Sequence, residues 1–229
     1  MRKYRYAALA TAGLLVLAAP ASAALASTHK ATPKPVLTIG KVAGAAVKKG
    51  AKISAGLAKG HKVNLMIGGF GSACSKSTFT AKIVKNPASA GRTSLAITGQ
   101  TLSGCKLSTT LASLKSITAI NTPWNASITT KNVLKITAAK KSKPVGVKAL
   151  IVLGSTTYTC VFTTSAVTGR TANKGNTVTF KGQKLTLSAT LSGSSYDTCK
   201  IAGTKATFSA VYGPVRDISV KHHPRVFVR

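Results

Sequence analysis

Apolar side chains recur at every second residue along much of this 229-residue chain, and this period constrains the fold more than any other feature. Segments such as Val63–Ile67 and Val133–Ile136 alternate apolar with polar residues, which is typical of strands with one buried face. Lysines such as Lys82 and Lys135 fall on the polar positions and leave the pattern intact. The sequence therefore predicts an all-β fold, built as an antiparallel β-sandwich or as an immunoglobulin-like or barrel-like architecture.

The same pattern predicts several further strands, at Phe79–Ile83, Ile117–Ile120, Ser127–Thr129, Thr177–Lys181 and Ala206–Tyr212. Val147–Leu153 is apolar enough to be a central strand that is covered on both faces. Ala139–Pro144 carries the residues of a turn. No segment has the period of a long amphipathic helix.

The first residues indicate export. Three basic residues near the start precede the apolar stretch Ala7–Ala19, and Pro20 precedes the small-residue motif Ala21-Ser22-Ala23. The apolar stretch is shorter than the roughly 20 residues of a transmembrane helix. We therefore expect a signal peptide at residues 1–23, with cleavage after Ala26 as the alternative. The mature protein is then secreted, either free or associated with the cell wall, and has no integral membrane span.

Residues 24–36 are rich in polar, basic and proline residues, which predicts a flexible basic linker. Residues 37–229 follow as an all-β globular region, long enough for one large domain or two small ones.

Two parts of this region share an ordered set of short motifs. The first part contains Cys74, Gly91, Gly99-Gln100-Thr101-Leu102, Cys105-Lys106 and Pro123. The second contains Cys160, Gly175, Gly182-Gln183-Lys184-Leu185, Cys199-Lys200 and Pro214. Each motif can arise by chance in a chain rich in Thr, Ser and Lys, so the evidence is their shared order. It favours a duplicated β unit, with halves at about residues 37–130 and 131–229.

Four cysteines allow three disulfide pairings. If the halves are duplicates, each pair closes within its own half, Cys74 with Cys105 and Cys160 with Cys199. An even number of cysteines in an exported chain favours disulfides, and each would stabilise the fold by roughly 3 to 4 kcal/mol. A zinc site is the competing interpretation, but the chain has no Cys-x-x-Cys pair, so we expect no metal and no other cofactor.

The motifs also suggest a resemblance. Leu37–Gly40, Cys74–Phe79 and Gly99–Cys105, with the tail Phe208–Val215 and Asp217, resemble a set of secreted actinobacterial proteins of unknown function that are common in streptomycetes. The resemblance covers most of the mature chain, and its motifs are structural rather than catalytic. It implies a secreted β-rich protein with two disulfides and carries no assigned activity. The high lysine content of this chain departs from those mostly near-neutral relatives.

The charge balance excludes several function classes. The chain has 33 Lys and Arg residues against two acidic residues, Asp197 and Asp217, and its net charge is +31. Two carboxylates in 229 residues are too few for oxygen-ligand calcium sites, and they make paired-carboxylate catalysis implausible.

The remaining catalytic patterns are weak. Ser103-Gly104-Cys105-Lys106 matches Ser-x-x-Lys, but its cysteine is a predicted disulfide partner and no Lys-Thr-Gly motif follows. A Ser-His-Asp triad would need one of the four histidines, which are His29, His61, His222 and His223. Trp124 could serve as a ligand platform, but a single tryptophan in a β protein is more often part of the core. We expect no enzyme activity.

Positive charge is the main indication of function. Lysine outnumbers arginine 26 to 7, which favours diffuse attraction over specific phosphate reading. Expected partners are teichoic acid, acidic polysaccharide or extracellular DNA. The residues expected to contact them are Lys48, Lys49, Lys59, Lys62, Lys140, Lys141, Lys143, Arg216, Lys221 and Arg225. The alternatives are that the charge serves only solubility, or that the protein is a small-molecule carrier with an apolar pocket of roughly 300 to 1,000 Å³.

Overall fold

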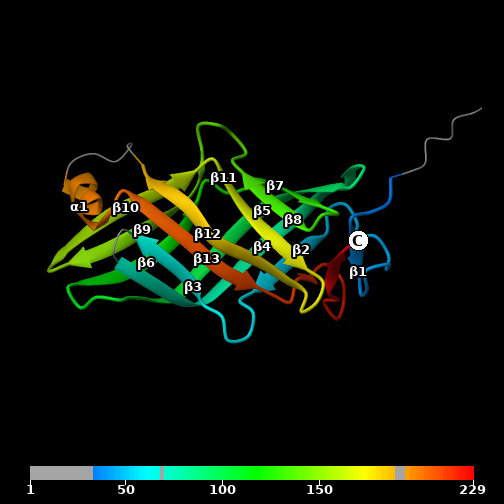
Figure 1. The fold of residues 1–229 in the computed structure, drawn as a ribbon, viewed down its shortest axis with the longest axis horizontal. Helices are drawn as coiled ribbons and strands as arrows, with labels where there is room; N and C mark the ends of the chain where they lie inside the picture. The colour runs from blue at the N-terminus through cyan, green and yellow to red at the C-terminus, as the bar shows by residue number, and fades with distance from the viewer. Residues whose placement is uncertain (1–32, 68–69, 189–193) are drawn as a thin grey trace, which may run out of the picture. The chain divides into compact units, whose positions relative to one another are not determined.

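A computed structural model describes residues 33–67, 70–188 and 194–229, which belong to one compact unit, Pro33–Arg229 (Figure 1). The expected signal peptide, residues 1–23, and linker residues 24–32 lie outside the described residues. Val36, the last residue of the expected linker, is fully buried and therefore belongs to the folded unit.

The described residues form fifteen strands and one short helix, which confirms the all-β prediction. The strands are β1 (Leu37–Ile39), β2 (Lys52–Gly56), β3 (Val63–Ile67), β4 (Phe70–Ser89), β5 (Arg92–Leu107), β6 (Ala112–Ile120), β7 (Trp124–Thr129), β8 (Val133–Thr137), β9 (Val145–Leu153), β10 (Thr156–Thr164), β11 (Ala166–Ala172), β12 (Thr177–Leu187), β13 (Lys205–Tyr212), β14 (Arg216–Asp217) and β15 (Val226–Val228). The helix is α1 (Ser194–Ala202).

Eight antiparallel strands close into a barrel, so the barrel and not the sandwich is the architecture found. The hydrogen-bonded order is β3–β4–β5–β7–β8–β11–β12–β13, and β13 pairs with β3 to complete the circuit. β10, β9 and β6 extend the sheet from β12, while β2 pairs with β4 and carries β14. The first strand, β1, pairs with the last strand, β15, in a separate two-stranded sheet.

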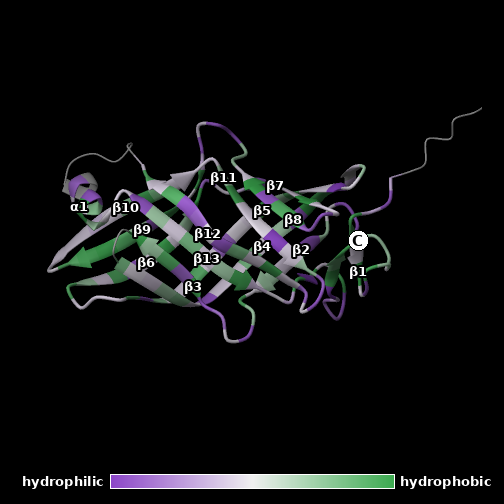
Figure 2. Cartoon of the chain, in the orientation of Figure 1, coloured by the Kyte–Doolittle hydropathy of each residue, from purple (hydrophilic) through white to green (hydrophobic). Residues whose placement is uncertain are grey.

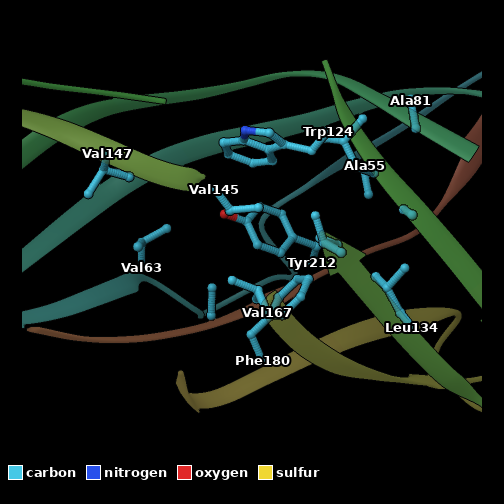
Figure 3. Packing of buried hydrophobic residues seen from close by; sticks show 14 of the residues in the cluster. Ala55, Val63, Ala81, Trp124, Leu134, Val145, Val147, Val167, Phe180 and Tyr212 are labelled. Atoms are coloured by element: carbon cyan, nitrogen blue, oxygen red, sulfur yellow. The ribbon is translucent and has the colours of Figure 1, made fainter. Parts of the chain in front are cut away.

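The side chains that fill the barrel interior are those that the two-residue apolar period places on one face of each strand. β3 buries Val63, Leu65 and Ile67 and exposes the residues between them, as the sequence predicted. Figure 3 shows the centre of this core, where Trp124, Phe180 and Tyr212 pack among aliphatic side chains. The ring of Phe79 contacts both Phe180 and Tyr212, with centroid distances of 5.7 and 4.7 Å.

β9 differs from its prediction. It does lie between two strands, β10 and β6, but it is not covered on both faces. Lys148 is exposed, and so is Leu153 at the end of the strand. Figure 2 shows β9 as hydrophobic over most of its length, so the sequence pattern predicted its composition correctly and its burial incorrectly.

Strand pairings repeat between residues 52–129 and residues 133–217. β4 pairs with β2 and β3, and the nearly continuous β10 and β11 pair with β9 and β8. Both disulfides join the predicted cysteines, Cys74 to Cys105 and Cys160 to Cys199. The segments also exchange strands, since β6 pairs with β9 and β13 pairs with β3. Strands from both segments therefore belong to one sheet, in which they stand in blocks.

Candidate functional site

The lysines form an unneutralised cationic exterior. Every lysine that the structure describes is exposed, because lysines occupy the outward positions of the strands or the turns between them. Within the described residues, no lysine or arginine forms an ion pair with a carboxylate. Asp217 is buried and accepts a hydrogen bond from the Ser219 N–H at 2.9 Å. The exterior is therefore available to external anions.

Strand register places like charges directly opposite one another. Lys52 on β2 pairs with Lys82 on β4. Two isolated bridges do the same, one between Arg216 and Arg225 and one between Lys140 and Lys143. Opposed like charges on one face are destabilising, and an anion bound between them would relieve the repulsion.

Lys52, Lys82, Arg216 and Arg225 form what we call the basic strand cluster. Arg216 lies opposite Ser54, two residues from Lys52 along β2, so the residues project from the same face of the sheet. Neighbouring strands are about 4.8 Å apart and alternate residues about 6.6 Å apart. The four cationic groups consequently originate within a small area of the barrel wall.

Arg216 is the best-positioned member of this cluster. Its side chain is half-buried, and Nη1 donates a hydrogen bond to the His223 carbonyl oxygen at 2.9 Å. The guanidinium makes no other hydrogen bond with the described residues. Because a guanidinium has five N–H donors in a rigid fork, the anchored group retains donors for a phosphate or carboxylate.

Some of the predicted polyanion-binding residues lie near this cluster. Lys48 and Lys49 precede β2, and their turn is joined to β4 by the hydrogen bond from Gly50 N to Ile83 O at 2.8 Å. Lys221 lies in the turn between β14 and Arg225.

The other predicted residues lie elsewhere. Lys59 and Lys62 belong to the turn between β2 and β3, and Lys140, Lys141 and Lys143 to the turn between β8 and β9. These turns project from opposite edges of the view in Figure 1. The predicted residues thus form several separate groups.

Sequence reasoning did not select Lys52 and Lys82 as binding candidates. In the sequence, each of these lysines is only one more polar residue within a strand of alternating polar and apolar residues. The register that places them opposite each other depends on the pairing of β2 with β4, which sequence periodicity does not define.

The candidate catalytic residues occupy unrelated positions. Ser103 and Lys106 lie on β5 around the disulfide cysteine Cys105, not at the start of a helix. Asp197 is exposed on α1, whereas Asp217 is buried in β14. His61, His222 and His223 are exposed in turns, and His29 lies outside the described residues. In the described part of the chain, no three His, Cys, Asp or Glu side chains come together as a metal site.

Trp124 belongs to the core. Only 3% of its surface is exposed, and its Nε1 donates to the Ile120 carbonyl oxygen at 2.9 Å. It therefore does not form a ligand platform on the surface.

An apolar cavity of about 80 Å³ lies inside the barrel, lined by side chains such as Leu95, Ile136 and Phe180. The β1–β15 pair contributes Leu37, Val226 and Val228 to its wall. Asn176 also lines the cavity, and its buried Oδ1 has no hydrogen-bond partner among the described residues. Ligand pockets usually begin at roughly 300 Å³, so this cavity is small for a metabolite.

Tyr212 anchors a buried polar network beside the cavity. Burial raises the pKa of its phenol to about 12, although hydrogen bonds with Ser77 and Gln100 act in the opposite direction. The phenol oxygen lies 2.8 Å from Ser77 Oγ and accepts a hydrogen bond from Gln100 Nε2 at 3.0 Å. Ser77 Oγ also donates to the Thr101 carbonyl oxygen at 2.7 Å, so the network is satisfied internally.

In the described part of the chain, no helix has the length and hydrophobicity needed to cross a bilayer. No protein-family model, curated protein or solved structure matches this chain. The residues and geometry of this protein are therefore the basis for its proposed function.

Proposed function

We propose that this protein is secreted and acts without catalysis, by binding anionic polymers of the cell envelope or extracellular matrix through electrostatic attraction. Teichoic acids, acidic polysaccharides and extracellular DNA have the required chemistry. Cell-wall association would follow from this binding, with no need for a covalent anchor.

One observation carries the proposal: all described lysines are exposed, and none is paired with a carboxylate. In most proteins, acidic side chains interspersed among the lysines reduce the surface potential. Here the net charge of the whole chain is +31, so the potential around the exterior is predominantly positive. Such a field attracts polyanions and has little means of discriminating between them.

The basic strand cluster supports the same function. Its opposed pairs are held in place by backbone pairing, so the repulsion between them is part of the folded state. Binding of a polymer phosphate or carboxylate at this position removes that repulsion and adds charge-assisted hydrogen bonds. We therefore expect the four residues of the cluster to contribute more to polymer affinity than four other exposed basic residues do.

Two features support secretion. Disulfides persist mainly in oxidising compartments, and this chain has two, with no free cysteine in the described residues. The signal peptide expected from the sequence gives an export route.

Co-sedimentation of the mature, oxidised protein with purified cell walls tests the proposal, before and after removal of teichoic acid and across a salt series. We expect binding that needs the polymer and falls steeply with salt, because each neutralised phosphate releases a counterion. Binding that is unchanged by salt, or no binding at low salt, would contradict the proposal.

Two variants with equal charge loss test the role of the cluster. One carries Lys52→Gln, Lys82→Gln, Arg216→Gln and Arg225→Gln. The control carries Lys131→Gln, Lys135→Gln, Lys174→Gln and Lys181→Gln, which replace exposed residues elsewhere. The cluster variant should lose more affinity than the control. Equal losses would show that binding is diffuse over the whole exterior.

The carrier hypothesis receives less support. The cavity is about 80 Å³ and its walls are continuous with the core. That volume is roughly a quarter of the lower limit expected for a metabolite pocket. We therefore propose only the first function.

A further inference from the structure

Exposed apolar side chains gather at one end of the barrel unit. Leu111 and Ile201 are the most exposed large apolar residues, at 77% and 85%, and Met66, Phe70 and Leu153 are exposed to a lesser degree. These five residues, which we call the apolar tip, come from the β3–β4 turn region, the β5–β6 loop, the end of β9 and α1. These elements lie at the left of Figure 1.

Several contacts hold the elements of the tip together. Ser108, in the loop that bears Leu111, exchanges two hydrogen bonds with Gly71, at 2.7 and 2.9 Å. Sδ of Met66 covers Gly71, where an added Cβ would lie 3.1 Å from the sulfur. Leu153 lies opposite Ala112, the residue after Leu111.

α1 is tied to the same end of the unit. Its Cys199 forms a disulfide with Cys160 on β10, and Ile201 follows two residues later. The end of the helix is also held by the hydrogen bond from Leu187 N to Thr204 O at 2.8 Å.

Four lysines lie within five residues of Leu111 or Ile201 along the chain. Lys106 is the last residue but one of β5, Lys115 lies on β6, Lys200 precedes Ile201 on α1, and Lys205 begins β13. All four are exposed. Asp197 on α1 is the single carboxylate side chain among the described residues of this end. Exposed apolar and basic side chains thus occur close together along the chain at this end.

We propose that the apolar tip docks this protein on the surface of anionic lipid membranes. Surface docking gains from apolar side chains that enter the headgroup–acyl boundary and from lysines that contact lipid phosphates. A second copy of the chain would be a poor occupant, because its tip would bring the same four lysines towards those of the first copy. An uncharged partner would bury the apolar residues but leave the lysines without anions.

This docking can be separated from polymer binding, because the apolar side chains of the tip do not contribute to electrostatic attraction. The basic strand cluster consists of Lys52, Lys82, Arg216 and Arg225, and none of these four residues belongs to the tip, although Lys82 shares the long strand β4 with Phe70. Either activity can therefore fail without the other.

Vesicle co-sedimentation of the oxidised mature protein tests the inference, with phosphatidylcholine vesicles that contain or lack phosphatidylglycerol. We expect binding only to the anionic vesicles, and about tenfold weaker binding for the double variant Leu111→Ser/Ile201→Ser, because less apolar surface enters the interface. The matched control is Val84→Ser/Val220→Ser, which removes two exposed valines outside the tip. The control should bind as the unaltered protein does.

A fluorescent reporter separates insertion from simple adsorption. Trp124 is buried, so a Leu111→Trp variant adds one exposed tryptophan. Its emission should shift to the blue with anionic vesicles and stay unchanged with a soluble polyanion such as heparin. Equal vesicle binding by the Ser variants, or binding without an emission shift, would overturn the inference.

Discussion

At the scale of single residues, three asparagine side chains hold the β1–β15 pair, which contributes to the wall of the cavity. Asn86 Oδ1 accepts hydrogen bonds from the Val36 and Leu37 N–H groups, and its Nδ2 donates to the carbonyl oxygens of Leu37 and Val47. Asn173 exchanges two hydrogen bonds with the Val228 backbone, and Asn176 donates to Val226 O. These amides satisfy backbone groups of β1 and β15 that have no other strand beside them.

Tyr212 gives a pH-dependent prediction. Its pKa is raised to about 12, against 10.0 for an exposed tyrosine, so the folded state keeps a proton that the unfolded chain releases above pH 10. Stability from this group is complete below pH 10, and it falls as the pH rises through the folded-state pKa, by about 2 kcal/mol at pH 12. Urea unfolding at pH 9 and pH 12 should show a smaller loss for Tyr212→Phe. Lysine deprotonation affects both proteins alike, and an equal loss in both would contradict the prediction.

At the scale of elements, β5 and β12 occupy corresponding places in the fold. Each contains the Gly-Gln-x-Leu motif, and each has a register shift at it, between Ile97 and Gly99 in β5 and between Phe180 and Gln183 in β12. Gly182 has φ of 56°, a left-handed conformation that glycine adopts without strain. β12 changes partner along its length, from β11 before the shift to β10 after it. In β12 the motif therefore lies where the strand changes partner, whereas β5 stays paired with β4 on both sides of its register shift.

The two disulfides are expected to differ in their local effects. Cys74 and Cys105 lie opposite each other within the long β4–β5 ladder, whereas Cys160–Cys199 joins β10 to α1. Chain entropy predicts a loss of about 4 kcal/mol for each bridge on replacement by alanine pairs. Urea unfolding measures this loss. Limited proteolysis should cut near α1 only in the Cys160→Ala/Cys199→Ala variant, and cleavage there in both variants would contradict the assignment.

At the scale of the whole molecule, folding concentrates positive charge without compensating carboxylates. Packing of the apolar faces and the two disulfides must offset this self-repulsion. The same charge that favours association with polyanions therefore opposes the compact state, and ionic strength affects both properties.

Salt should stabilise this protein. Because no ion pair exists among the described residues, screening weakens repulsion and removes little attraction. Between 10 and 200 mM sodium chloride, the melting temperature should rise by about 2–4 °C for each kcal/mol of repulsion screened. The variant with four glutamines in the basic strand cluster should show a smaller rise. A melting temperature that falls with salt would contradict this account.

Local sequence patterns predicted where the strands lie better than they predicted how deeply each strand is buried. The strand at Val63–Ile67 was predicted with its observed bounds, because alternating residues report directly on a half-buried strand. The motif order gave both disulfide pairings. The burial of β9 was predicted incorrectly, because an apolar run does not reveal that the strand ends at an exposed tip. The linker prediction extended to Val36, whose burial depends on Asn86, fifty residues away.

The amino-acid sequence by itself determined the all-β class, the outward placement of the lysines and the pairing of the cysteines, since these follow from local periodicity and motif order. Only the tertiary structure decided that the sheet closes as a barrel and that strands of the two segments exchange places. It also decided which charges and apolar residues become neighbours: Lys52 faces Lys82, and Leu111 precedes the residue paired with Leu153. Register and closure are properties of contacts between distant segments, and a period of two residues is compatible with many of them.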